Sequence, residues 1–490
     1  MARAHPLLQP YKPSAEDPFD AIKAAHLLNR AGFGGTPAEI DRVMKLGPDG
    51  AMEWLFDFPD AGADEQSRTD VPDLSAIDGY PSDFRALQKM LVGKTDEEKK
   101  EARKKLQMAN REAVLATGNW WLKRMAFGPY PLQEKLTLFW HGHFTTSAKD
   151  ERSATAMWNQ NELLRRMSAG NFRSFVRAIS RDPAMLDYLN NSQNRKAHPN
   201  ENYARELMEL FTLGIGNYTE DDIKNSARAF TGWAHDGDDF VFRKFDHDTD
   251  VKTFMGRKGN FDGDDIIDII LSKEACGNFI GMELYQFFVN DSCPDDLKAA
   301  LGDILRDNKY EMRPLLRTMF ASKAFYHPTV IGSQIKSPVQ LVVGTIRTLG
   351  LDMPGERAVS GALNQMGQVP LHPPNVKGWP GGHQWISTST LFVRYNTAVW
   401  LAGGSGQFAT MNQRNKFRGV AQAGDTGFRP STGGTPEAVV DAWVQRLIGR
   451  PISAEAREVL IDALGGHPER EDSVRKMVQL IVSMPEYQLC

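Results

Sequence analysis

The chain has 490 residues, of which 41% are hydrophobic and 24% are charged, and it contains 26 Phe and 10 Trp. This composition is typical of a packed globular protein and excludes an intrinsically disordered chain. Lys and Arg number 58 and Asp and Glu number 62, so the formal net charge is −4. This balance argues against a nucleic-acid-binding protein. Three scattered cysteines exclude a disulfide framework.

The length and the hydropathy pattern set two further expectations. The chain exceeds the roughly 250–300 residues at which one hydrophobic core stops growing, so we expect more than one core or a large helical assembly. No apolar run approaches the roughly 20 residues that span a bilayer, and the first residues lack the apolar stretch of a signal peptide. We therefore expect a cytoplasmic protein with no membrane insertion.

Helix signals recur from the start of the chain. Thr36 and Glu39 have the spacing of a capping box, and Gly47 is expected to end the helix that follows. Residues 95–125 begin with acidic side chains and contain no proline, which predicts one long helix. Thr219, followed by three acidic residues, is expected to begin another helix.

Strand signals are sparse. Phe240 and Phe242 alternate with other residues after a turn-rich segment, which predicts a short hairpin within residues 233–262. No β-α-β alternation is present, so a parallel sheet is not expected. The predicted fold class is therefore mainly α, with a large multi-helix globular body and a short β-hairpin insertion.

The sequence predicts four segments. Residues 1–17 are an N-terminal tail, and residues 18–402 are the helical body. Residues 403–435 are rich in Gly, Ser, Thr and Gln and are predicted to be a long surface loop. Residues 436–490 have helical patterns again but are too short to hold a large core, so we expect them to dock on the body.

The first candidate site is the pair His141 and His143, close to the end of a helix that begins near Pro131. Residues two apart in a helix point to nearly opposite sides, so the two imidazoles bind one metal ion only if Gly142 ends the helix. The alternative is that both are core histidines with their ring nitrogens bonded to backbone or carboxylate groups.

The second candidate is the segment 200–210, the acidic helix. On a helix, Asn202, Glu206 and Glu209 share one face. Two carboxylates three residues apart can hold a metal ion or supply an acid and a base. The alternative is that Arg205 pairs with acidic residues four positions away, such as Glu201, in surface ion pairs.

The third candidate is His247 and Asp248, followed by Lys252. A carboxylate beside an imidazole can bind a divalent cation or position a proton shuttle. The alternative assigns the nearby DGDD stretches to turns and helix caps, with Asp264 as the cap of the next helix.

The fourth candidate is the Pro/Gly-rich segment 372–385, the Trp loop. Its prolines and glycines favour an ordered turn, and we expect it to pack beside the acidic helix. Trp379 and Trp385 can stack on a sugar ring or anchor the loop to the body. Asn375 and Lys377 are expected at the rim of the same site.

Six ordered motifs resemble the bacterial family called Domain of Unknown Function 1800. This resemblance runs from about residue 20 to the end of the chain. It implies a large helical fold and bacterial origin, with no established activity. Relatives are often encoded beside a phosphatase/sulfatase-like family, and many carry export signals. The motifs are HLLNRAGFGG at 26–35, FWHGHF at 139–144, PNENYARELMELFTLG at 199–214, ARAFTGW at 227–233, HDTDVKTFMG at 247–256 and PPNVKGWPGG at 373–382.

The polar residues of these motifs lead to two hypotheses of function. The first is a hydrolase with a polar cleft, assisted by a divalent metal ion as the candidate cofactor. The second is a non-catalytic binding or assembly protein that partners a phosphatase/sulfatase-like protein and uses the same residues as a packing network. In the first hypothesis the catalytic residues are Glu206, Glu209, His247, Asp248 and Arg205, the metal ligands are His141, His143 and Glu206, and the ligand-binding residues are Asn202, Lys252, Asn375, Lys377 and Trp379.

Overall fold

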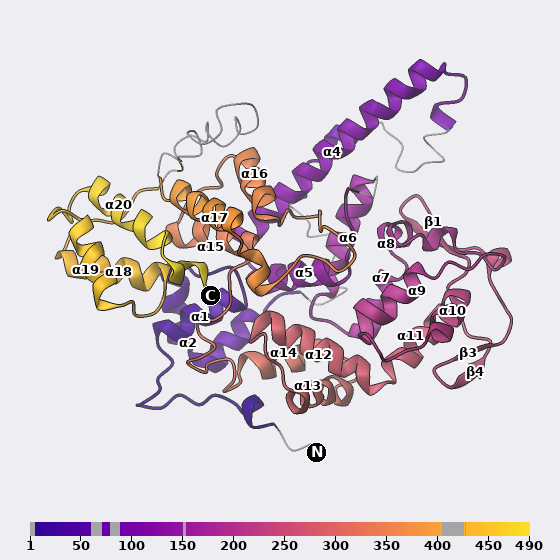
Figure 1. Cartoon of the computed structure of the whole chain (residues 1–490), viewed down its shortest axis with the longest axis horizontal. Coiled ribbons are helices and arrows are strands. Elements are labelled where there is room, and N and C mark those ends of the chain that lie inside the picture. The colour runs from indigo at the N-terminus through magenta and orange to yellow at the C-terminus, as the bar shows by residue number, and fades with distance from the viewer. Residues whose placement is uncertain (1–4, 60–70, 79–88, 150–152, 404–425, 427) are drawn as a thin grey trace.

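The computed structural model describes residues 5–59, 71–78, 89–149, 153–403, 426 and 428–490. Helices dominate these residues, and the strands form two small antiparallel pairs. The predicted mainly α fold with a β insertion is confirmed. Figure 1 shows a helical body from which the first half of one long helix projects. No helix in the described part of the chain has the length and apolar character needed to cross a lipid bilayer.

The first hydrophobic core lies in the N-terminal and central parts of the chain. Trp140 and Phe144 stack within it, with ring centroids 5.4 Å apart. The N-terminal segment adds to this core, because buried Tyr11 packs against Tyr326 at 4.8 Å. The contributing helices are α1 (Ala21–Arg30), α2 (Pro37–Leu55), α5 (Pro131–His143), α6 (Ala154–Met167), α7 (Phe172–Ile179), α8 (Pro183–Tyr188), α9 (Asn202–Glu206), α10 (Glu220–Ala229), α11 (Gly263–Leu271), α12 (Glu274–Phe288), α13 (Asp295–Asp307) and α14 (Met312–Phe320).

The second core joins the long helix to the C-terminal part of the chain. The segment 436–490 shares this core, since Val440, Trp443 and Val474 are buried in it. Most of the loop predicted at 403–435 lies outside the described residues. The main helices of this core are α4 (Asp96–Phe127), α15 (Pro338–Leu349), α16 (Glu356–Met366), α17 (Thr388–Leu401), α18 (Pro436–Leu447), α19 (Ala454–Ala463) and α20 (Glu471–Val482).

Short elements complete the fold. Strand β1 (Trp233–Asp236) pairs with β2 (Asp239–Phe242), with Trp233 opposite Phe242. Strand β3 (Lys252–Phe254) pairs with β4 (Arg257–Gly259). The segment 233–262 therefore holds two hairpins where the sequence predicts one. The 3-10 helices are η1 (Pro6–Leu8), η3 (Ser75–Ile77), η4 (Asn191–Gln193), η6 (Lys244–Asp246), η7 (Gly382–Trp385) and η9 (Pro485–Gln488).

The helix ends test the predicted caps. Thr36 and Glu39 form the predicted capping box at the start of α2, and α4 begins at Asp96 as the predicted long helix, with a second capping box of Thr95 and Glu98. Gly47 has a positive φ of 66°, but it produces a kink within α2 and the helix resumes at Pro48. The prediction for Asp264 is wrong, because Asp262 caps α11.

Candidate functional site

The acidic helix changes its hydrogen-bonding pattern in the middle of the candidate site. Helix α9 ends at Glu206, and a π-helix, η5 (Leu207–Thr212), follows directly. Buried Tyr203 and Phe211 fix one face against the first core. Glu206 and Glu209 are half-buried on the other side. Short π-helical turns occur frequently at functional sites, so this segment is the strongest structural candidate.

Glu206 lies in an environment that favours its protonated form. Burial raises the pKa of Glu206, and the negative charge of Glu209 raises it further. The cations Arg205 and Lys377 oppose this rise, which places both close to the carboxylate. The Tyr218 hydroxyl donates a hydrogen bond of 2.9 Å to Glu209. One carboxylic acid is therefore biased towards the neutral state, beside a second carboxylate that already accepts a hydrogen bond.

Arg205 is held by carboxylates on two helices. It forms an ion pair with Glu201 at 3.3 Å, as the spacing of four residues predicts. Two further bonds, of 2.9 and 3.0 Å, join its guanidinium to Glu220 at the start of α10. This two-point contact fixes the guanidinium beside the acidic helix. Asn202 is exposed at the start of α9.

The Trp loop is docked on the end of α5. Gly378 has a φ of 79°, and a Cβ atom there would lie 2.1 Å from the carbonyl oxygen of Gly142. Trp379 packs against His141, with ring centroids 5.4 Å apart, and Trp385 is buried. The Asn375 side-chain oxygen accepts a hydrogen bond from the backbone N–H of Lys377 at 2.9 Å. This hydrogen bond fixes the backbone of exposed Lys377 in a tight turn.

The two candidate metal histidines lie in different environments. Helix α5 continues through Gly142 to His143, so the helix end that joint binding requires is not present. His141 is fully buried between Trp121 and Trp379, and burial lowers its pKa to about 3. His143 Nε2 lies 3.0 Å from the Phe211 carbonyl oxygen, and burial lowers the pKa of His143 to about 4. In the described parts of the chain, no three His, Cys, Asp or Glu side chains form a group that could hold a metal ion.

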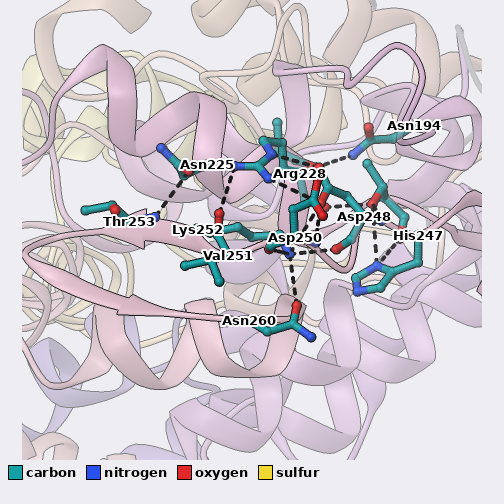
Figure 2. Close-up of polar contacts among 12 residues, drawn as sticks. Asn194, Asn225, Arg228, His247, Asp248, Asp250, Val251, Lys252, Thr253 and Asn260 are labelled. Atoms are coloured by element: carbon teal, nitrogen blue, oxygen red, sulfur yellow. Dashed lines mark hydrogen bonds and ion pairs between the residues drawn. The ribbon is translucent and has the colours of Figure 1, made fainter.

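His247, Asp248 and Lys252 form a separate polar network (Figure 2). Arg228 donates hydrogen bonds of 2.7 and 3.2 Å to the Asp248 carboxylate. Burial favours the neutral form of Asp248, but these bonds outweigh it and lower the pKa of Asp248. Buried Lys252 donates to the carbonyl oxygen of Asp248 at 2.6 Å, and His247 Nδ1 lies 2.8 Å from the Thr231 carbonyl oxygen.

Helix α10 separates this network from the acidic helix. Glu220, which binds Arg205, is its first residue, and Arg228, which binds Asp248, lies eight residues later. At 1.5 Å per residue these two positions are about 12 Å apart along the axis. The structure therefore brings Glu206, Glu209, Arg205 and Lys377 together and places His247, Asp248 and Lys252 elsewhere.

Several residues of these clusters were not among the predicted site residues. Tyr218 and Arg228 bind the predicted carboxylates directly. Buried Asn194 donates to the Ala227 carbonyl oxygen at 2.8 Å and accepts from the Asn200 N–H at 2.9 Å. Arg228 lies in the ARAFTGW motif, so the motif contained a signal for it. No pattern of local spacing pointed to Tyr218 or Asn194.

Comparison with known proteins identifies one family. The family model described as "Protein of unknown function (DUF1800)" matches residues 26–489. No curated protein and no solved structure matches the chain.

Proposed function

This chain belongs to the DUF1800 family of proteins of unknown function, and from the geometry of its acidic helix we propose that it is a hydrolase with Glu206 and Glu209 as its acid and base. The observation that carries this proposal is the raised pKa of half-buried Glu206 beside Glu209 and opposite Lys377. In general acid–base hydrolysis, two carboxyl groups in unlike environments commonly act as the acid and the base.

Each carboxyl group has a defined task in this reaction. Glu206 donates its proton to the leaving-group oxygen as the bond to that oxygen breaks. Glu209 accepts a proton from water, whose oxygen forms the new bond to the substrate. One water molecule is consumed in each turnover. Glu206 ends deprotonated and Glu209 ends protonated, and proton exchange with the solvent restores both starting states. Ester and glycosidic bonds are the substrate classes that this chemistry fits.

The residues next to the two glutamates bind the substrate or hold the acidic helix in place. Lys377 supplies a cation that can bind a carboxylate or hydroxyl group of the substrate. Arg205 holds the acidic helix against α10 through Glu220. His247, Asp248 and Lys252 take no part in the proposed reaction and stabilise the hairpin region, since their polar atoms bind other protein groups there. A divalent cofactor stays a prediction from the sequence.

The experiment compares Glu206→Gln and Glu209→Gln with the control Asp221→Asn. Asp221 is an exposed acid on the neighbouring α10. Activity is measured on a panel of aryl esters and aryl glycosides. We expect each Gln variant to lose about 100-fold or more in kcat, as for removal of a general acid or base, and the control to match the wild type. Full activity of Glu206→Gln on a substrate that the wild type hydrolyses would disprove the assignment.

The alternative is a non-catalytic binding or assembly protein that partners a phosphatase/sulfatase-like protein. The observation that favours it is the network of Arg228, Asp248 and Lys252. Their hydrogen bonds go to other protein groups, which is typical of a structural role rather than a catalytic one. The two hypotheses differ in the stability of Glu206→Gln. Because the pKa of Glu206 is raised, its ionised form opposes folding above that pKa, so the acid–base proposal expects no loss of melting temperature at pH 7. A clear loss, together with co-purification of such a partner, would favour the alternative.

A further inference from the structure

A large cleft lies outside the acidic-helix site. It has a volume of about 2540 Å³ and lies between α4, the segment from α8 to the β1–β2 hairpin, α16 and the first residues of the Trp loop. In Figure 1 the first half of α4 projects away from the body beside these elements. The described residues that line the cleft include neither Glu206 nor Glu209. Its function is therefore a separate question.

One face of α4 gives this cleft a basic wall. Lys100, Arg103, Lys104 and Arg111 line the cleft, and their spacing places them on one side of the helix. All four side chains are exposed. No described carboxylate lies within ion-pair distance of any of them. Four cations on one wall, none of them paired with a carboxylate of the described residues, attract an anion even though the whole chain has a net charge of −4.

The other walls add cations and amides. Lys149 and Arg243 line the cleft on these walls, together with Arg195, which pairs with Asp246 at 3.8 Å. Amide side chains lie between the charges and can both donate and accept hydrogen bonds. The amide residues that line the cleft are Gln107, Asn110, Asn190, Gln193 and Asn364. Cations interspersed with amides suit a ligand that carries both anionic groups and hydroxyl groups.

We propose that this cleft binds an anionic polysaccharide, with the α4 cations on its carboxylate or sulfate groups and the amides on its hydroxyls. The cleft is well above the roughly 300–1,000 Å³ of a small-molecule pocket, which favours a polymer. The stripe from Lys100 to Arg111 is about 16 Å long at 1.5 Å per residue, so it can follow an extended chain. This inference does not depend on the proposed hydrolysis.

Two features of the lining favour a sugar polymer over a nucleic acid. No Phe, Tyr or Trp is among the described residues of the cleft, whereas single-stranded nucleic acids are usually held by stacking on such rings. Four aspartates also line the cleft, namely Asp78, Asp187, Asp236 and Asp238. Carboxylates do not bind anionic groups, but they accept hydrogen bonds from the hydroxyl groups that a polysaccharide carries between its charges.

Two matched double variants of the full chain test this proposal. Lys100→Ala/Lys104→Ala removes two lysines from the cleft wall. Lys99→Ala/Lys105→Ala removes two lysines from the same helix that do not line the cleft and instead pair with Asp96 and Glu101. The change in net charge is identical. Because this part of α4 buries nothing before Ala109, both variants are expected to fold with unchanged melting temperatures.

Binding is measured by fluorescence anisotropy at physiological ionic strength. The probes are a labelled heparin oligosaccharide, an oligogalacturonate, single-stranded DNA and polyglutamate. We expect the wild type to bind one of the two oligosaccharides, the cleft variant to bind it about threefold to tenfold more weakly, and the control to stay within about twofold of the wild type. Equal weakening by both variants, no binding of either oligosaccharide, or tighter binding of DNA or polyglutamate would overturn the proposal.

Discussion

At the scale of single residues, His141 stands out because neither of its ring nitrogens has a hydrogen-bond partner. It is fully buried, and burial lowers its pKa to about 3. The folded chain therefore holds neutral imidazole at pH values where the unfolded chain, with an ordinary pKa near 6.5, binds a proton. Above pH 6.5 neither state binds this proton, so His141 does not reduce the free energy of unfolding. Between pH 6.5 and 3 only the unfolded chain binds it, so the free energy of unfolding falls as the pH falls.

His141→Leu should remove this acid sensitivity. At neutral pH we expect a change of less than about 1.5 kcal/mol, since no hydrogen bond is lost and the volumes are similar. Near pH 4.5 the variant should be more stable than the wild type by about 2–3 kcal/mol. Urea unfolding at several pH values measures both. Exposed His383→Leu is the control and should leave the profile unchanged. Parallel pH profiles for His141→Leu and the wild type would contradict the burial argument.

At the scale of elements, the contact between the Trp loop and α5 depends on two glycines. Gly378→Ala would place a Cβ atom 2.1 Å from the Gly142 carbonyl oxygen, at a positive φ of 79°. The backbone conformation alone costs about 1–2 kcal/mol, and the clash adds to it. We expect a lower melting temperature and faster trypsin cleavage after Lys377, because the loop undocks.

Gly381→Ala is the matched control within the same loop. Gly381 has a φ of −121°, and nothing lies within 4 Å of a Cβ atom built there. Its melting temperature and its cleavage rate should equal those of the wild type. Equal cleavage of both variants would mean that the contact of Gly378 with Gly142 does not hold the loop.

Element ends were predictable where the chemistry is local. The predicted capping box of Thr36 and Glu39 joins residues three positions apart, so the sequence contains both partners. Asp264 was misassigned because its partner is Arg181, at 2.6 Å, and no local pattern reveals an ion pair across 83 residues. The π-helix after Glu206 was not predicted either, since its hydrophobic spacing is close to that of an α-helix.

The candidate site shows the same limit. Sequence spacing predicted that Glu206 and Glu209 lie on one side of the acidic helix, because both are on one element. The approach of Lys377 from a loop about 170 residues later depends on the docking of Gly378, and only the family motifs pointed to it. Spacing left open whether His141 and His143 converge, and the answer depended on the continuation of α5 through Gly142.

At the scale of the whole molecule, the two cores are joined by a buried charged network. Glu134 on α5 accepts hydrogen bonds from Arg165 on α6 at 2.8 and 3.0 Å and from Arg124 on α4 at 2.9 Å. The Trp121 indole N–H donates to the same carboxylate at 3.0 Å. Burial raises the pKa of Glu134, but the two arginines outweigh it and the net pKa is lowered. Helices of both cores therefore meet at one ionised carboxylate.

Glu134→Gln should lower the free energy of unfolding of the whole chain, because it leaves the buried Arg165 guanidinium without its main counter-charge. We expect a loss of about 3–5 kcal/mol in the free energy of unfolding, the usual result of removing one partner of a buried pair. Glu356→Gln, which breaks the half-exposed pair with Lys123, is the matched control and should cost less than about 1 kcal/mol.

Because the stability due to Glu134 requires ionisation, the difference in stability between Glu134→Gln and the wild type should shrink as the pH falls through the lowered pKa of Glu134. Urea unfolding followed by hydrogen exchange in both cores measures the loss. If α4 and α5 lost protection while α12 and α13 kept it, the network would stabilise only its own helices and not the junction of the two cores.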